Sequence, residues 1–174
     1  MKELKGTFRK AKLKDAESIQ FLINEYAKRG LMLPRSINSI YENIRDFWVY
    51  EEERKVLGTC ALTVFWDDLA EIRSLAVSPS ETGRGIGSTL VKKALEEASE
   101  LGVKRVFTLT YQVEFFKKLG FYEIDKNTLP HKIWRDCINC VKFPNCDETA
   151  MEVILNDSRR TASADKKRNG RDNR

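Results

Sequence analysis

Three glycines recur at every second position within residues 82–88, as Gly83, Gly85 and Gly87, with Arg84 between the first two. An apolar run precedes them and a stretch with helical spacing follows. The start of a helix carries about four unpaired backbone N–H groups and the positive end of the helix dipole. Since glycine lacks Cβ, a phosphate can approach such a backbone closely. The segment therefore predicts a phosphate cradle between a strand and a helix; the alternative is a glycine-rich turn without a ligand.

A second set of side chains that could do chemistry lies closer to the C-terminus, as His131, Cys137, Cys140 and Cys146. Four such ligands can hold zinc in a tetrahedral site. In a cytosolic protein such a cluster favours a metal site or reduced thiols over disulfides, and the sequence leaves these two open. Cys60 lies inside an apolar run and is expected to be a small buried hydrophobe.

The elements that must position these residues follow from hydrophobic spacing and from Gly, Pro and Asp signals. The expected strands are residues 6–13, 47–52, 55–66, 69–77, 103–111, 121–124 and 149–155, and the expected helices are residues 14–30, 36–44, 86–102 and 113–120. This order predicts an α/β fold built in layers, with a mixed, mostly antiparallel central sheet of about six to seven strands and helices on both faces. One domain should span residues 1–155.

Charge separates the last residues from this domain. The whole chain carries a net charge of +5, and residues 156–174 hold seven Lys and Arg against three Asp, which is +4 of that total. This tail has no apolar residue larger than Ala, so we expect it to be disordered. It reads either as a nucleic-acid arm or as a solubilising end, and we favour the second.

The compartment is predicted from what the sequence lacks. No apolar run approaches the roughly 18 residues that span a membrane. The first 15 residues contain no apolar core of a secretory signal. We therefore expect a cytoplasmic protein without a membrane partner.

Within residues 71–121, a strand ends in Leu75-x-Val77-x-Pro79, the glycine-rich loop and an amphipathic helix follow, and a later short helix closes on Leu-Gly-Phe at residues 119–121. In these features the segment resembles the GCN5-related N-acetyltransferase superfamily. The resemblance implies acetyl-CoA as cosubstrate. Its pantetheine arm would pair with backbone around Leu75, Ala76 and Val77, and its pyrophosphate would bind the loop. The implied cofactor-binding residues are Leu75, Ala76, Val77, Gly83, Arg84, Gly85, Ile86, Gly87, Ser88 and Phe116.

Two positions depart from the superfamily pattern. Thr82 stands where the loop usually has Gln or Arg, although most phosphate contacts there come from backbone N–H groups. Phe116 stands where many members have a Tyr that donates a proton. Tyr111, at the end of the preceding strand, is the nearest substitute for a general acid; otherwise the thiolate takes its proton from solvent or from the ammonium formed in the reaction.

A narrower resemblance, over roughly residues 7–155, is to acetyltransferases of the N-acetylglutamate synthase type. It rests on the pair Arg35–Ser36, on Glu71 at the head of a strand, and on the strand and aromatic pair of residues 106–121. It implies transfer of acetyl to the α-amino group of L-glutamate, a step of arginine biosynthesis. Glu71 would be the base, with pairing to Arg73 as its structural alternative.

A dicarboxylate substrate requires cations, and the arginine fork matches a carboxylate. We expect Arg35, Ser36 and Arg73 to bind substrate, with Lys132 and Arg135 as weaker candidates. The oxyanion would be held by a backbone N–H near Ala76 or Val77. Alternative acceptors are another amino acid, a polyamine or a protein N-terminus, and a non-catalytic acyl-CoA or nucleic-acid binder is the alternative from another class. A small molecule is the expected partner, nucleic acid is not, and a homodimer stays open.

Overall fold

The computed structural model describes residues 2–130 and 147–156, and its order of elements confirms the predicted one. The strands are β1 (Thr7–Lys10), β2 (Phe47–Glu52), β3 (Lys55–Val64), β4 (Leu69–Val77), β5 (Arg105–Thr110), β6 (Tyr122–Glu123) and β7 (Thr149–Ile154). The helices are α1 (Ala16–Ala27), α2 (Ile37–Glu42), α3 (Ile86–Leu101) and α4 (Val113–Lys118).

Strand β1 ends earlier than the sequence predicts, because its expected second half turns instead. Residues Leu13–Asp15 form a short 3-10 helix. The Asp15 carboxylate accepts hydrogen bonds from the Lys12 backbone N–H at 2.7 Å and from the Arg9 guanidinium at 2.7 and 3.0 Å. These bonds offer the backbone an alternative to the strand ladder.

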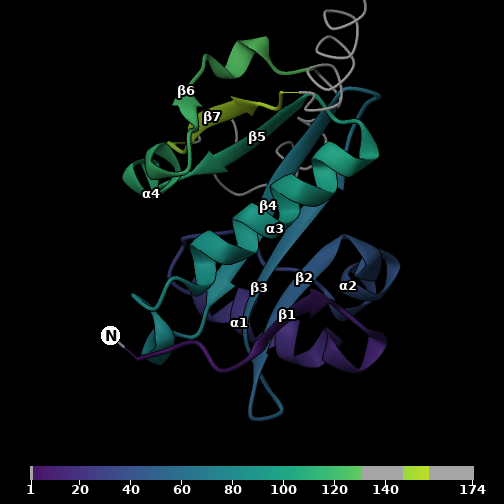
Figure 1. Ribbon diagram of the computed structural model, residues 1–174, viewed down its shortest axis with the longest axis vertical. Helices are drawn as coiled ribbons and strands as arrows, with labels where there is room; N and C mark the ends of the chain where they lie inside the picture. Colours follow the sequence, from purple (N-terminus) through teal and green to yellow (C-terminus); the bar gives the residue numbers. More distant parts are fainter. Residues whose placement is uncertain (1, 131–146, 157–174) are drawn as a thin grey trace, which may run out of the picture.

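The strands form one sheet in the order β1-β2-β3-β4-β5-β7-β6. Every neighbouring pair is antiparallel except β4 and β5, which run parallel. Residues 69–71 of β4 pair with residues 105–107 of β5, and beyond them the two strands diverge (Figure 1). The Thr108 hydroxyl donates to the Ile72 carbonyl at 2.9 Å at the point of divergence. The later half of β4 therefore presents one backbone edge that β5 does not cover.

Helices cover both faces of this sheet, which confirms the predicted mixed, layered fold. Helix α3 crosses one face in Figure 1, and its buried stripe is Leu90, Val91, Ala94 and Ala98. Gly58 of β3 allows this close approach, since a Cβ there would lie 2.8 Å from the Ile86 side chain. The other face packs against α1 and α2, in a core cluster of Ala16, Ile19, Ile23, Ile40, Phe47, Val49 and Ala61.

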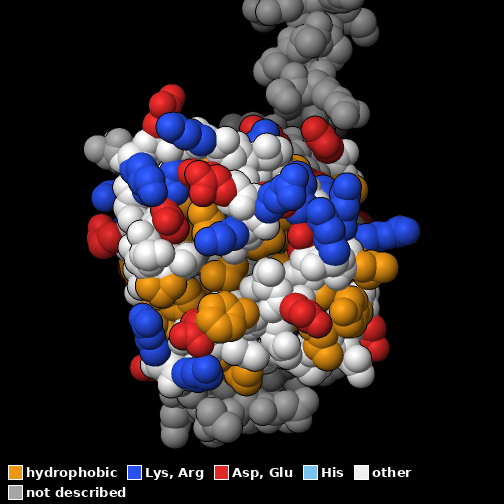
Figure 2. Space-filling view, turned by 90° about the horizontal axis from the view of Figure 1, so that it is seen from below, with side chains coloured by type: hydrophobic (Ala, Val, Ile, Leu, Met, Phe, Trp, Pro, Cys, Tyr) orange, Lys and Arg blue, Asp and Glu red, His pale blue; other side chains and the backbone are white. Residues whose placement is uncertain are grey.

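The surface at the end of the molecule seen in Figure 2 mixes charge and hydrophobicity. Figure 2 shows the densest group of Lys and Arg side chains at the upper right of this face and further ones along its left, with hydrophobic side chains across the middle and lower part. Among the described residues, no helix is long and apolar enough to cross a membrane.

Candidate active site

Strand β4 changes direction at a β-bulge in its second half. Thr59 of β3 lies opposite Ala76, whereas Ala61 lies opposite Arg73, so β4 holds one residue more than β3 over this stretch. Ser74 lies in the bulge with φ of 54°, which is unusual for a residue with a side chain. A bulge bends its strand and re-aims neighbouring groups. Along β4, the bulge comes after Glu71 and Arg73 and before Leu75, Ala76 and Val77.

After the bulge, alternate residues of β4 turn their backbone groups to opposite edges. The Ser78 N–H donates to the Leu57 carbonyl of β3 at 2.8 Å. The N–H and C=O of Val77, one residue earlier, must then point away from β3, toward the edge that β5 leaves open. The Val77 carbonyl indeed accepts a hydrogen bond from the Tyr26 hydroxyl of α1 at 2.5 Å. The backbone predicted to pair with pantetheine thus points away from β3 toward the open edge, where its carbonyl accepts the Tyr26 hydroxyl.

The glycine-rich loop joins this strand to α3 in the way the spacing predicts. Gly83 and Gly85 have φ of 81° and 83°, the left-handed region that favours glycine, and Gly85 is the N-cap of α3. The first intrahelical bond runs from the Thr89 N–H to the Gly85 carbonyl at 3.1 Å. The N–H groups of Ile86, Gly87 and Ser88 therefore lie at the start of the helix without helical acceptors, which is the arrangement that binds phosphate.

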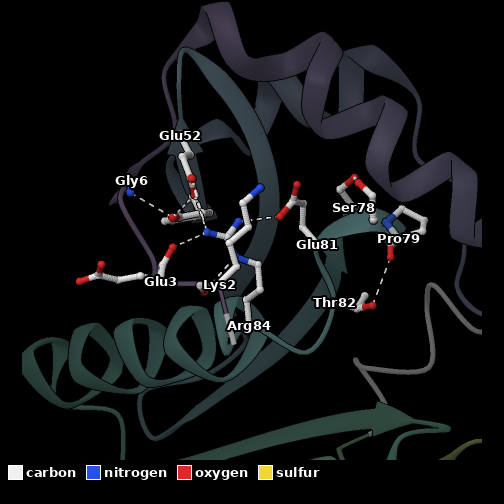
Figure 3. A network of polar contacts seen from close by, with 11 residues as sticks. Lys2, Glu3, Gly6, Glu52, Ser78, Pro79, Glu81, Thr82 and Arg84 are labelled. Carbon is white, nitrogen blue, oxygen red and sulfur yellow. Dashed lines mark hydrogen bonds and ion pairs between the residues drawn. The ribbon is translucent and has the colours of Figure 1, made fainter.

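The Arg84 side chain turns away from that N–H cradle (Figure 3). Its guanidinium donates to the carboxylates of Glu81 at 2.6 Å and Glu52 at 3.0 Å, and to the backbone carbonyls of Lys2 and Glu3. Only its backbone N–H remains a candidate for the cofactor. No local pattern marks these partners, because Glu3 and Glu52 lie 81 and 32 residues away along the chain.

Arg35 and Ser36, the pair before α2, have different surroundings. The Arg35 guanidinium lies over the Phe47 ring at 5.1 Å, donates to the Ser39 hydroxyl at 3.1 Å and reaches the Ser74 hydroxyl at 3.5 Å. The Ser36 hydroxyl accepts the Ser39 N–H at 3.1 Å and so caps α2. Ser36 is exposed, and its observed contact is the helix cap.

The register of the sheet brings Arg35 and Arg73 to one face. Phe47, Ala61 and Arg73 lie directly opposite one another across β2, β3 and β4, so their side chains share a face. Arg35 stacks over Phe47 on that same face. Glu71 lies two residues before Arg73 and therefore on the same side of β4, with a carboxylate oxygen 4.0 Å from the Arg73 guanidinium. The structure thus brings together three of the predicted site residues.

Tyr111 and Phe116 are placed differently from each other. The Tyr111 hydroxyl, at the end of β5, donates to a carboxylate oxygen of Asp147 at 2.6 Å. Phe116 is only 3% exposed and packs edge-on against Phe115 and Phe121, with ring centroids 5.0 and 5.1 Å apart. Its side chain therefore packs in the hydrophobic core, and its implied contact with the cofactor stays a prediction.

Burial raises the pKa of two groups, the Cys60 thiol and the Tyr26 phenol. Burial raises the pKa of the Cys60 thiol to about 12, so Cys60 is protonated and acts as a hydrophobe, as predicted. Burial also raises the pKa of Tyr26, which keeps its hydroxyl a donor to Val77.

The predicted metal ligands His131, Cys137, Cys140 and Cys146 lie outside the described residues, as do Lys132, Arg135 and the basic tail. Within residues 2–130 and 147–156, no group of three or more His, Cys, Asp or Glu could hold a metal ion. The zinc site, and the division into a domain of residues 1–155 and a tail of residues 156–174, stay predictions.

A sheet that splits beside a glycine-rich helix start is the architecture of an acyl-CoA-dependent transferase. Residues 14–121 match the model of the acetyltransferase (GNAT) family. The chain belongs to this family and is an acetyl-CoA-dependent N-acetyltransferase.

Known proteins similar to this chain narrow the class. An uncharacterised N-acetyltransferase of Chlorobaculum tepidum is 49% identical over 147 residues, covering 84% of this chain and 95% of the relative. An amino-acid acetyltransferase of Mycobacterium tuberculosis is 39% identical over 127 residues, covering 71% of this chain and 72% of the relative.

Among solved structures, the N-acetylglutamate synthase of Neisseria gonorrhoeae, crystallised with coenzyme A and N-acetylglutamate, superimposes with a TM-score of 0.80 at 27% identity. The match covers 89% of this chain but 36% of that longer enzyme.

Proposed function

We propose that the chain transfers the acetyl group of acetyl-CoA to the α-amino group of L-glutamate. The observation that supports this acceptor most is the placement of Arg35 and Arg73 on one face of the sheet, beside Glu71 and next to the open edge of β4. Two guanidinium groups suit a substrate with two carboxylates. Relatives named amino-acid acetyltransferase and N-acetylglutamate synthase support the same substrate class.

In this proposal the loop and the edge of β4 hold the cosubstrate. The pyrophosphate binds the N–H groups at the start of α3, where the helix dipole is positive. The pantetheine lies along the edge that turns away from β3, where Val77 directs its backbone. The acetyl group then lies near the bulge, on the side of the sheet where Glu71 and Arg73 project.

Glu71 takes the proton from the ammonium of the substrate, directly or through one water molecule. The neutral amine attacks the thioester carbon, and the oxyanion that forms accepts a hydrogen bond from the backbone N–H of Val77. Collapse of this tetrahedral intermediate breaks the carbon–sulfur bond and releases CoA thiolate. Tyr111 is the candidate that returns a proton to the sulfur, and the proton lost by the new amide nitrogen is the other source.

The test is thiol release from acetyl-CoA by the full chain with a panel of glutamate, glutamine, aspartate, lysine and spermidine, and mass spectrometry of the product. We expect glutamate to have the highest kcat/KM and the product to be N-acetylglutamate. Absence of turnover with glutamate at millimolar concentration, while another amine is acetylated, would refute the acceptor and leave the N-acetyltransferase class intact. Spermidine as the best acceptor would be hardest to reconcile with two arginines at the site.

A further inference from the structure

The Arg84 guanidinium is the point where three distant segments meet. Arg84 lies in the glycine-rich loop and is only 9% exposed. It donates to the Glu3 carbonyl at 2.6 Å and the Lys2 carbonyl at 3.4 Å, to Glu81 at 2.6 Å, and to Glu52 at the end of β2 at 3.0 Å. Figure 3 shows the guanidinium between the N-terminal segment and the end of β2.

The N-terminal segment is itself fixed to β2; we call residues 2–6 the N-terminal strap. The Gly6 N–H donates to the Tyr50 hydroxyl at 3.0 Å, and this hydroxyl donates to Glu52 at 2.5 Å. Tyr50 is fully buried, so the bond anchors the strap to the core. Gly6 lies so close to β2 that a Cβ would overlap the Glu51 carbonyl oxygen. Leu4 packs against the core cluster that contains Tyr50.

This arrangement bears on the loop in two ways. Gly83 and Gly85 flank Arg84 with left-handed backbone, and a loop of such residues loses much conformational freedom when a ligand orders it. Fixing the Arg84 side chain on the strap removes part of that cost before the ligand binds. The guanidinium also neutralises Glu52 and Glu81, whose carboxylates would otherwise repel an anionic ligand at the start of α3.

We propose that the N-terminal strap, acting through Arg84, positions the glycine-rich loop for binding acetyl-CoA. Arg84 is a positioning residue: its side chain does not face the phosphates but holds the loop whose N–H groups bind them. The inference rests on the proposed role of this loop as the pyrophosphate cradle, and it does not depend on which amine is the acceptor.

Two single substitutions break the connection between the strap and the loop, one from the loop and one from the strap. Arg84→Met removes the donors and keeps the aliphatic stem, and Gly6→Ala displaces the strap without changing the loop. Each should raise the Kd of CoA, measured by isothermal titration calorimetry, and the KM of acetyl-CoA by roughly tenfold, the scale of one lost charge-assisted hydrogen bond. The KM of the acceptor amine should stay within about twofold. The double variant should be no worse than about twofold beyond Arg84→Met alone, because Arg84→Met already breaks the connection to the strap.

Arg45→Met is the matched control, since Arg45 is exposed and lies in the short turn before β2. It should leave both constants unchanged. Arg84→Lys keeps the charge with fewer donors and should give an intermediate Kd; if Arg84→Met fails to fold, Arg84→Lys and Gly6→Ala decide the matter.

The outcomes separate the two claims. A wild-type chain that does not bind CoA refutes the cradle itself. A wild-type chain that binds CoA, with Arg84→Met and Gly6→Ala binding equally well, overturns the strap while leaving the cradle intact. Equal rises in the KM of acetyl-CoA and of the amine, or effects that multiply in the double variant, would show that Arg84 and the strap have a general structural role. Either result would also overturn the proposed role of the strap.

Discussion

The conformations of Gly85 and Gly87 predict opposite results for the same substitution two residues apart. Gly85 has φ of 83°, whereas Gly87 lies inside the first turn of α3 and shows no left-handed φ. An Ala at position 85 costs about 1–2 kcal/mol for the left-handed backbone, offset by about 0.4–1 kcal/mol from the stiffer unfolded chain. An Ala at position 87 gains about 0.5–1 kcal/mol of helix stability. Its Cβ would meet the Phe115 ring at 3.5 Å, an ordinary contact.

The two variants should therefore differ by about 1.5 kcal/mol, or about 3–6 °C in Tm for a chain of this size. Thermal unfolding by circular dichroism measures this difference. If the backbone at position 85 relaxes, the N–H groups of the loop move, and the KM of acetyl-CoA should rise about tenfold in Gly85→Ala. Gly87→Ala keeps its helical backbone, so any rise in its KM for acetyl-CoA would come from the added Cβ beside the cradle rather than from displaced N–H groups.

Gly87→Ala thus serves as the matched control for Gly85→Ala, at equal added volume. Equal Tm values for the two variants would refute the assignment of backbone strain to Gly85. A Gly87→Ala variant that loses acetyl-CoA affinity as strongly as Gly85→Ala would show that space at the loop, rather than its backbone conformation, limits cosubstrate binding.

Four further outcomes are expected. Arg35→Met should raise the KM of glutamate by about 10–100-fold, the scale of one lost carboxylate contact, with the KM of acetyl-CoA within twofold; equal effects on both would make Arg35 structural. Glu71→Gln should lower kcat by about 10²-fold at unchanged KM of acetyl-CoA, and an unchanged kcat would exclude Glu71 as the base. Burial alone would raise the pKa of Asp15. The hydrogen bonds from Arg9 and the Lys12 N–H, together with the charge of Arg9, lower it by more, so the net pKa lies below the ordinary 3.8. The Asp15 contribution to stability is then present above about pH 4 and is lost as the pH falls through the lowered value, so Asp15→Asn should lower the Tm at pH 7 and converge with the wild type in acid. Metal analysis of chain purified without chelator should find zinc that Cys140→Ser lacks, and the absence of stoichiometric metal in the wild type would refute that site.

The sequence predicted the order of elements correctly because that order depends on local signals. The helix expected over residues 86–102 is observed as α3, with Leu90, Val91, Ala94 and Ala98 buried on one side. Alternate glycines marked the turn before it, and two of them have the left-handed backbone that only glycine adopts freely. Ser36, placed before a helical pattern, does cap α2.

Contacts between distant segments escaped prediction. The acceptors of Arg84 lie in the strap and at the end of β2, and nothing in the local pattern marks them. The bulge at Ser74 also has no sequence signal, because Ser there resembles any polar residue of a strand. The edge-on packing of Phe116 against Phe121 likewise has no local signal, and the implied role of Phe116 at the cofactor stays a prediction.

By itself the sequence determined a strand, a glycine turn and a helix start in succession, since backbone conformation follows from the residues that adopt it. Only the tertiary structure decided that β4 leaves β5 after residue 71 and exposes an edge, because strand register depends on the whole sheet. Register also placed Arg73 on the same face as Phe47, and thus near Arg35. The loop was predicted from its glycines, while its fixation by Arg84 required the folded chain.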